Sequence, residues 1–210
     1  AAKVMAGKNL KELGFTEEII PKYISVKESV FPFIKFSNVD VLLGPEMKST
    51  GEVMGIDVSF GRAFAKAQIA TGLKLPESGT AFISVKDEDK PAALAIAQQL
   101  SKMNFNLVAT SGTANYLSKS ALKVGSINKF KEGSPHVAEA IEKGEVDLVI
   151  NTVFGSQAIE DSFTLRRASL MYNLPYYTTI AGAEAMLEAL KELQSGPLTV
   201  TSLQDRVRSL

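Results

Sequence analysis

Strand-like and helical segments alternate regularly in the second half of this sequence, and this alternation limits the possible folds more than any other feature. Apolar runs rich in β-branched and aromatic residues predict strands at 81–85, 105–110, 123–129, 146–152 and 176–180. Segments with helical spacing predict helices at 91–103, 113–119, 135–143, 158–172 and 183–193. Strands that alternate with helices across short connections form parallel sheets covered on both faces. We therefore predict an α/β fold with a doubly wound parallel sheet over residues 79–193.

The preceding residues follow another pattern, so we divide the chain into domains at 1–72 and 73–210. Helical spacing at 1–13 ends at Gly14, and a second helix is predicted at 59–69. Strand-like segments occupy 23–31 and 33–36, and 43–52 is rich in turn residues. These elements do not close a sheet, so we expect the end of an α+β domain that begins upstream. For the tail, we expect a short strand at 198–200 and a poorly anchored end.

Composition excludes several classes of function. The 210 residues contain 23 Lys and Arg and 23 Asp and Glu, and this balance argues against nucleic-acid and membrane partners. Cysteine is absent and His136 is the single histidine, which excludes disulfides, thiolate zinc sites and His-pair metal centres. No apolar run has the length of a membrane span, and no secretory signal opens the chain. We expect a cytoplasmic protein that is a piece of a longer chain, with no metal site.

Polar residues gather where the predicted parallel strands end. Ligands bind beyond the carboxyl ends of such strands. The turn at 110–113 offers three hydroxyls, a glycine and free helix N–H groups, which are the features that hold a phosphate. The residues expected to converge on an anion or nucleotide site are Lys90, Thr110, Ser111, Gly112, Thr113, Lys129, Asn151 and Thr152.

Each of these residues also has an ordinary structural interpretation. The hydroxyls at 110–113 could cap a helix, the lysines could be solvated, and Asn151 and Thr152 could cap the helix that follows. Neither a GxxxxGK[ST] phosphate loop nor a GxGxxG fingerprint is present. We expect His136 to cap or pack rather than act as a base, and the acidic residues at 87–89 and 160–161 to have structural or solvated roles. No catalytic residue is predicted.

Several motifs resemble those of a known family. The segments 84–90, 109–113 (ATSGT), 128–133 (NKFKEG), 135–136, 150–152 (INT) and 158–162 (AIEDS) resemble the methylglyoxal-synthase-like domain, in particular the C-terminal allosteric domain of carbamoyl-phosphate synthase large subunits. The segments 2–8, 24–28, 31–33 and 42–55 (LLGPEMKSTGEVMG) resemble the end of the second ATP-grasp unit of that family. The resemblance covers nearly the whole chain.

The resemblance implies a regulatory role within a larger ligase. Family members make carbamoyl phosphate for the pyrimidine and arginine pathways from glutamine or ammonia, bicarbonate and two ATP, with Mg or Mn. The implied partners are the rest of the large subunit, a small glutaminase subunit and further copies of the chain. No cofactor is implied for this segment, whose C-terminal domain would bind effectors such as UMP and IMP. By motif, the effector phosphate would be held by Lys90, Thr110, Ser111, Gly112, Thr113 and Lys129, and the nucleoside would face Asn151 and Thr152.

The sequence departs from the family at two places. Val153, Phe154, Ser156 and Gln157 stand where relatives have hydroxyl residues and paired arginines, so the contacts to base and sugar should differ. Members activated by ornithine have His and Asp at the positions of Pro175 and Tyr177, which leaves Thr178 as the remaining match for a second effector site.

Two alternative functions remain open. One is a methylglyoxal-synthase-type lyase, in which Glu132 would replace a carboxylate base expected near Ser134. The other is an oligomerisation module that binds no effector.

Overall fold

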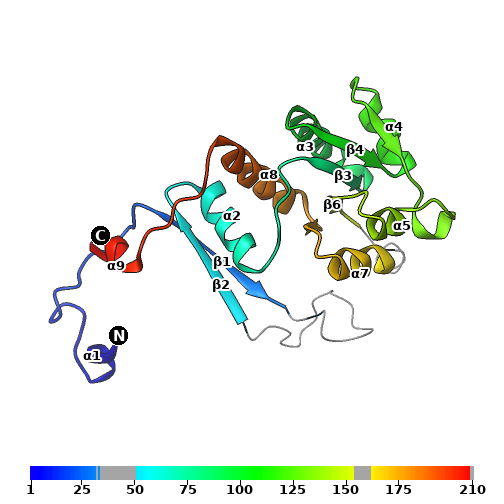
Figure 1. Ribbon diagram of the computed structural model, residues 1–210. Helices are drawn as coiled ribbons and strands as arrows, with labels where there is room; N and C mark the ends of the chain where they lie inside the picture. Colours follow the sequence, from blue (N-terminus) through cyan, green and yellow to red (C-terminus); the bar gives the residue numbers. More distant parts are fainter. Residues whose placement is uncertain (32, 34–50, 154–161, 209–210) are drawn as a thin grey trace.

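The parallel sheet predicted from the sequence is confirmed in the computed structural model, which describes residues 1–31, 33, 51–153 and 162–208 (Figure 1). Five parallel strands lie in the order β5-β4-β3-β6-β7. Their bounds are β3 Gly79–Ser84, β4 Phe105–Ala109, β5 Val124–Ser126, β6 Leu148–Asn151 and β7 Tyr176–Tyr177. Each lies in or next to a predicted segment. The chain is therefore an α/β protein, as expected.

Helices cover both faces of this sheet, and each face has its own hydrophobic core. One core joins the sheet to α3 (Lys90–Lys102), α4 (Ser111–Ser118) and α8 (Ile180–Ser195). The other joins it to α5 (Val137–Glu142) and α7 (Phe163–Met171). Phe82 and Ile83, which are adjacent in β3, belong to different cores because side chains alternate across a strand. Both are 1 % exposed, so the central strand is buried on both faces.

A separate antiparallel hairpin precedes the sheet. It pairs β1 (Ile24–Val30) with β2 (Gly51–Asp57) and packs on α2 (Phe60–Ala70), which is the helix predicted at 59–69. Ser59 begins this helix as expected of an N-cap, since its hydroxyl accepts a hydrogen bond from the Arg62 N–H at 3.3 Å. Figure 1 shows α8 between α2 and the parallel sheet. The hairpin therefore reaches the sheet through two packed helices.

Three predictions about the first domain and the tail are corrected. The helix expected at 1–13 is wrong, because α1 spans Ala2–Met5 alone and buries no residue that could stabilise it. The turn-rich segment expected at 43–52 overlaps a strand, because Gly51 and Glu52 begin β2, whose glycines weaken its strand pattern. Residues 198–200 do not form the expected strand, and the tail instead forms a helix at α9 (Leu203–Arg208).

The tail is also better anchored than expected. Arg206 of α9 donates to the Ile56 carbonyl at 3.0 Å, and its guanidinium lies 5.4 Å from the centre of the Tyr23 ring. The predictions for 34–36, 43–50 and 158–161 lie outside the described residues, as do Phe154, Ser156 and Gln157. The division of the chain at 72 and 73 stays a prediction.

A buried polar network connects the hairpin to the parallel sheet. The Gln68 amide of α2 donates to Glu28 Oε1 of β1 at 2.6 Å, and the Tyr177 hydroxyl of β7 donates to Gln68 Oε1 at 2.9 Å. The second oxygen of Glu28 is buried and has no hydrogen-bond partner among the described residues. Burial raises the pKa of Glu28, although the bond from Gln68 opposes this shift. Burial and the nearby Glu28 charge also raise the pKa of Tyr177.

Replacing Glu28 by glutamine should raise the free energy of unfolding at pH 7. The raised pKa means that the folded state binds the proton more tightly than the unfolded state, so charged Glu28 costs stability once the pH exceeds its ordinary pKa of 4.5. Urea unfolding of Glu28→Gln and wild type at pH 7 and pH 3.5 measures this. The gain should vanish at the lower pH, and the exposed control Glu77→Gln should show none. An equal gain at both pH values would contradict a charge effect.

Candidate functional site

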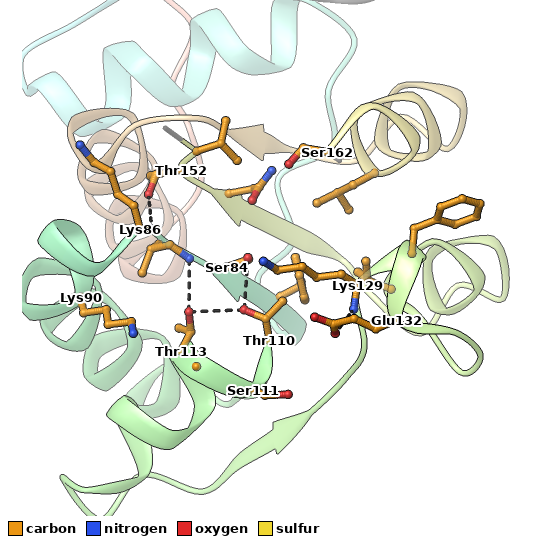
Figure 2. A pocket seen from close by; sticks show the side chains of 18 of the residues that line it. Ser84, Lys86, Lys90, Thr110, Ser111, Thr113, Lys129, Glu132, Thr152 and Ser162 are labelled. Carbon is orange, nitrogen blue, oxygen red and sulfur yellow. Dashed lines mark hydrogen bonds between the residues drawn. The ribbon is translucent and has the colours of Figure 1, made fainter. Parts of the chain in front are cut away.

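A cavity of about 320 Å³ opens at the carboxyl ends of β3, β4 and β6. The eight residues predicted for phosphate and nucleoside binding all line it: Lys90, Thr110, Ser111, Gly112, Thr113, Lys129, Asn151 and Thr152. Figure 2 shows Lys90 and Lys129 reaching one cluster of hydroxyls from different elements. The structure thus brings together residues that are up to 62 positions apart in the sequence, and their binding role stays a prediction.

Hydroxyl groups tie the three strand ends together at this cavity. Thr113 Oγ1 accepts from the Val85 N–H at 3.3 Å, and Thr152 Oγ1 accepts from the Lys86 N–H at 3.2 Å. The Thr110 hydroxyl can donate to Ser84 Oγ at 3.2 Å or to Thr113 Oγ1 at 3.5 Å (Figure 2). Because these groups are anchored to backbone of neighbouring strands, the polar side of the cavity is preorganised.

The first turn of α4 faces the cavity with its backbone donors available. Thr110 is at the N-cap position, as its ordinary interpretation predicted, yet its hydroxyl makes no capping bond to the helix. Within the described part of the chain, no group accepts from the N–H groups of Ser111, Gly112 and Thr113. A helix N-terminus carries a partial positive charge and attracts anions. This turn therefore offers an anion several aligned donors.

Lys90 brings a full positive charge to the same turn. A Cβ placed on Gly112 would lie 3.8 Å from Lys90 Nζ, so the ammonium lies close to the positive end of α4. Lys90 also pairs with Asp87 Oδ1 at 2.6 Å and lowers the pKa of that carboxyl through this hydrogen bond and its charge. Two positive groups side by side repel each other, and an anion between them would relieve that repulsion.

Lys129 lies just before a short 3₁₀ turn, η3 (Phe130–Glu132), on another part of the rim. Its Nζ has no carboxylate within 4.0 Å among the residues that the structure describes. The Glu132 carboxylate accepts from the Lys129 backbone N–H at 2.9 Å, which fixes the turn. The side chain of Lys129 therefore remains available to a ligand.

The two residues predicted to face the nucleoside, Asn151 and Thr152, lie in the more apolar part of the cavity. Asn151 is 2 % exposed and donates from Nδ2 to the Tyr176 hydroxyl at 2.8 Å. The sequence analysis did not predict the apolar residues that line this part of the cavity, because an apolar side chain in a strand or helix indicates only a place in the core. These residues are Phe82, Val137, Ala138 and Leu165. The polar lining residues Ser84 and Lys86 were also missed, although they directly follow the β3 core residues at the expected edge.

Two further predicted residues lie outside the cavity. Thr178 is exposed beyond the end of β7 and does not line the cavity, so the structure does not bring it together with the other eight. His136 caps α5 as expected, because its Nδ1 accepts from the Glu139 N–H at 3.3 Å. Among the described residues no cluster of three His, Asp or Glu side chains could hold a metal ion. None of the helices in the described ranges is long and apolar enough to cross a membrane.

Comparison with known proteins identifies the family. Residues 92–178 match the model of the MGS-like domain. Carbamoyl phosphate synthase large chains match over 98 % of this chain, with 56 % identity for the protein of Pseudomonas putida and 53 % for that of Myxococcus xanthus. The chain spans about a fifth of the length of these relatives, 19 % in each case. A methylglyoxal synthase from Elizabethkingia anophelis is 21 % identical, with a TM-score of 0.44 over 54 % of this chain and 79 % of that one.

The match to the large-chain relatives extends through both the hairpin and the parallel sheet. Residues 92–178 therefore belong to the MGS-like domain family, and the chain as a whole is a relative of the MGS-like C-terminal region of carbamoyl phosphate synthase large chains.

Proposed function

We propose that this chain is the regulatory region of a carbamoyl phosphate synthase large chain and that its cavity binds a nucleoside monophosphate of the UMP or IMP type. The supporting observation is the convergence of Lys90, Lys129 and the uncapped first turn of α4 on one cavity. Hydrogen bonds to a charged group contribute about 1.5–3 kcal/mol each, so three or four of them suffice for micromolar affinity after association costs.

The cavity also has the size and the division of surface that a mononucleotide requires. Its volume of about 320 Å³ lies at the lower end of the range for small-molecule sites. The phosphate would lie at Thr110–Thr113 between the two lysines. The nucleoside would extend toward Asn151, Thr152 and the apolar residues beside them.

In this proposal, catalysis belongs to the rest of a cytoplasmic enzyme. The parent ligase would use glutamine, bicarbonate and ATP with Mg or Mn, and its partners would include a glutaminase subunit. The β1–β2 hairpin and α2 would be the end of its second ATP-grasp unit. The chain itself would supply no catalytic group and would need no cofactor.

The proposed regulation would act through contacts between the cavity and the hairpin. Helix α2 packs on α8, and Glu28, Gln68 and Tyr177 form hydrogen bonds from β1 to β7. Strand β7 pairs with β6, whose last residue is Asn151 of the cavity. An effector that binds two arrangements of these elements unequally would change activity, typically by 1–3 kcal/mol of coupling.

Calorimetric titration of the chain with UMP and with IMP tests binding, and the ATPase rate of the full-length enzyme with each nucleotide tests regulation. We expect micromolar binding of at least one nucleotide and a changed rate. Self-association without nucleotide binding would favour an oligomerisation module. Formation of methylglyoxal from dihydroxyacetone phosphate would favour a lyase, in which Glu132 would be the candidate base.

A further inference from the structure

We propose that Glu132 makes this cavity selective for ligands with one phosphate group over ligands with two. The inference rests on the proposed function and adds a residue that sets its specificity. Glu132 lines the same cavity as Lys129 and lies on the turn that Lys129 begins. Figure 2 shows its carboxylate on the cavity side of that turn, close to Lys129.

The carboxylate is held in place at the rim. Glu132 Oε2 accepts from the Lys129 backbone N–H at 2.9 Å, and this bond spans three residues. The carboxylate makes no ion pair with a described lysine or arginine within 4.0 Å. Its negative charge is therefore not neutralised by any described side chain, and the hydrogen bond keeps it from turning away while the turn persists.

The charges around the cavity are nearly balanced. Among the described residues, the cavity is lined by three lysines, Lys86, Lys90 and Lys129, and by two carboxylates, Asp87 and Glu132. Lys90 is paired with Asp87, and Lys86 is paired with Glu88 at 3.0 Å. Lys129 and Glu132 make no ion pair with a described residue, and their charges cancel, so the described side chains leave no excess positive charge for a second phosphate group.

A second phosphate group would meet this carboxylate. One phosphate monoester carries about 1.5 to 2 negative charges at neutral pH and can occupy the donors of α4, Lys90 and Lys129. A diphosphate is longer and more negative, and with its first phosphate on the α4 donors its additional charge would extend toward the residues of the rim, which include Glu132. Glu132 is a like charge at that rim, so it should repel the second group.

A structural role alone makes a different prediction. If Glu132 only fixes the turn, glutamine should replace it without consequence, because the side-chain carbonyl of glutamine also accepts from the Lys129 N–H. Glu132→Gln therefore removes the charge while keeping the hydrogen bond. Glu132→Asp keeps the charge and should keep the selectivity.

The experiment measures the dissociation constants of UMP and UDP by calorimetry for wild type, Glu132→Gln, Glu132→Asp and the exposed control Glu145→Gln. We expect wild type to prefer UMP, and Glu132→Gln to reduce this preference about tenfold by improving UDP binding. The change should shrink between 50 and 500 mM salt, roughly as the Debye length falls. Circular dichroism checks that each variant folds.

The outcomes separate this inference from the proposed function. If wild type binds none of UMP, UDP and IMP, the proposed function fails, and the selectivity is then measured with IMP and IDP if IMP alone binds. If wild type binds UMP but Glu132→Gln leaves the ratio of the two constants unchanged, Glu132 is only a turn residue and the inference is overturned. Loss of selectivity in the control as well would assign the effect to net charge rather than to this position.

Discussion

Replacing Lys129 by alanine is expected to weaken UMP or IMP binding about 10- to 150-fold, which corresponds to 1.5–3 kcal/mol for a hydrogen bond to a charged group. Lys129 should have this large effect because no carboxylate among the described residues pairs with its ammonium, so a phosphate would be its principal partner. Lys90 shares its charge with Asp87, and its replacement should cost less. Calorimetric titration of each variant measures both effects.

The matched control for Lys129 is Lys119→Ala. Lys119 is an exposed lysine at the end of α4, outside the cavity, and its loss changes the net charge by the same amount. Its variant should bind as wild type does, apart from a small effect that disappears with added salt. Equal affinities for Lys129→Ala and wild type would remove Lys129 from the site, and equal losses in the two variants would reduce its role to long-range attraction.

Gly55→Ala should destabilise the chain by about 3 kcal/mol, at the upper end of the range for overpacked cores. A Cβ at this position would overlap the Ala63 carbonyl oxygen and would lie 2.6 Å from the Ala67 nitrogen, and both atoms belong to the backbone of α2. Backbone cannot move aside as a side chain can, so β2 and α2 would have to separate. Urea unfolding followed by circular dichroism measures the loss.

Gly51→Ala is the control within the same strand. Among the described residues, a Cβ there would meet the Val30 Cβ alone, at 3.7 Å, which is ordinary contact. Its variant should be as stable as wild type or slightly more stable, because alanine restricts the unfolded chain. Similar losses in the two variants would indicate a general intolerance of strand β2 to alanine and would contradict the close packing of Gly55 on α2.

The strands and helices of the parallel sheet were predictable because each has a local pattern. The run Ala81–Val85 is apolar and the segment after Pro91 has helical spacing, and neither signal depends on distant residues. Strand β2 was not predictable in this way. Gly51 belongs to the segment at 43–52 that is rich in turn residues, and Gly55 is required by the approach of a helix backbone that only the folded chain reveals.

The same distinction applies to the cavity. Lys90, Thr110 and Lys129 could be chosen from the sequence because the ends of parallel strands meet at one edge of a sheet, whatever the details of packing. The net charge of the cavity could not be predicted from the sequence, because it depends on which carboxylates line the cavity. Asp87 and Glu132 line the cavity, whereas the neighbouring Glu88 does not.

By itself, the sequence determined the α/β class, the edge of the sheet where polar groups gather and the residues that meet there, because these follow from periodicity and chain direction. The tertiary structure alone decided that Gln68 joins Glu28 to Tyr177 and that Arg206 anchors the tail on Ile56. It also decided that Lys129 has no carboxylate partner among the residues the structure describes. These contacts join residues from separate elements, and their distances are set by how the helices pack on the two sheets, which no local pattern records.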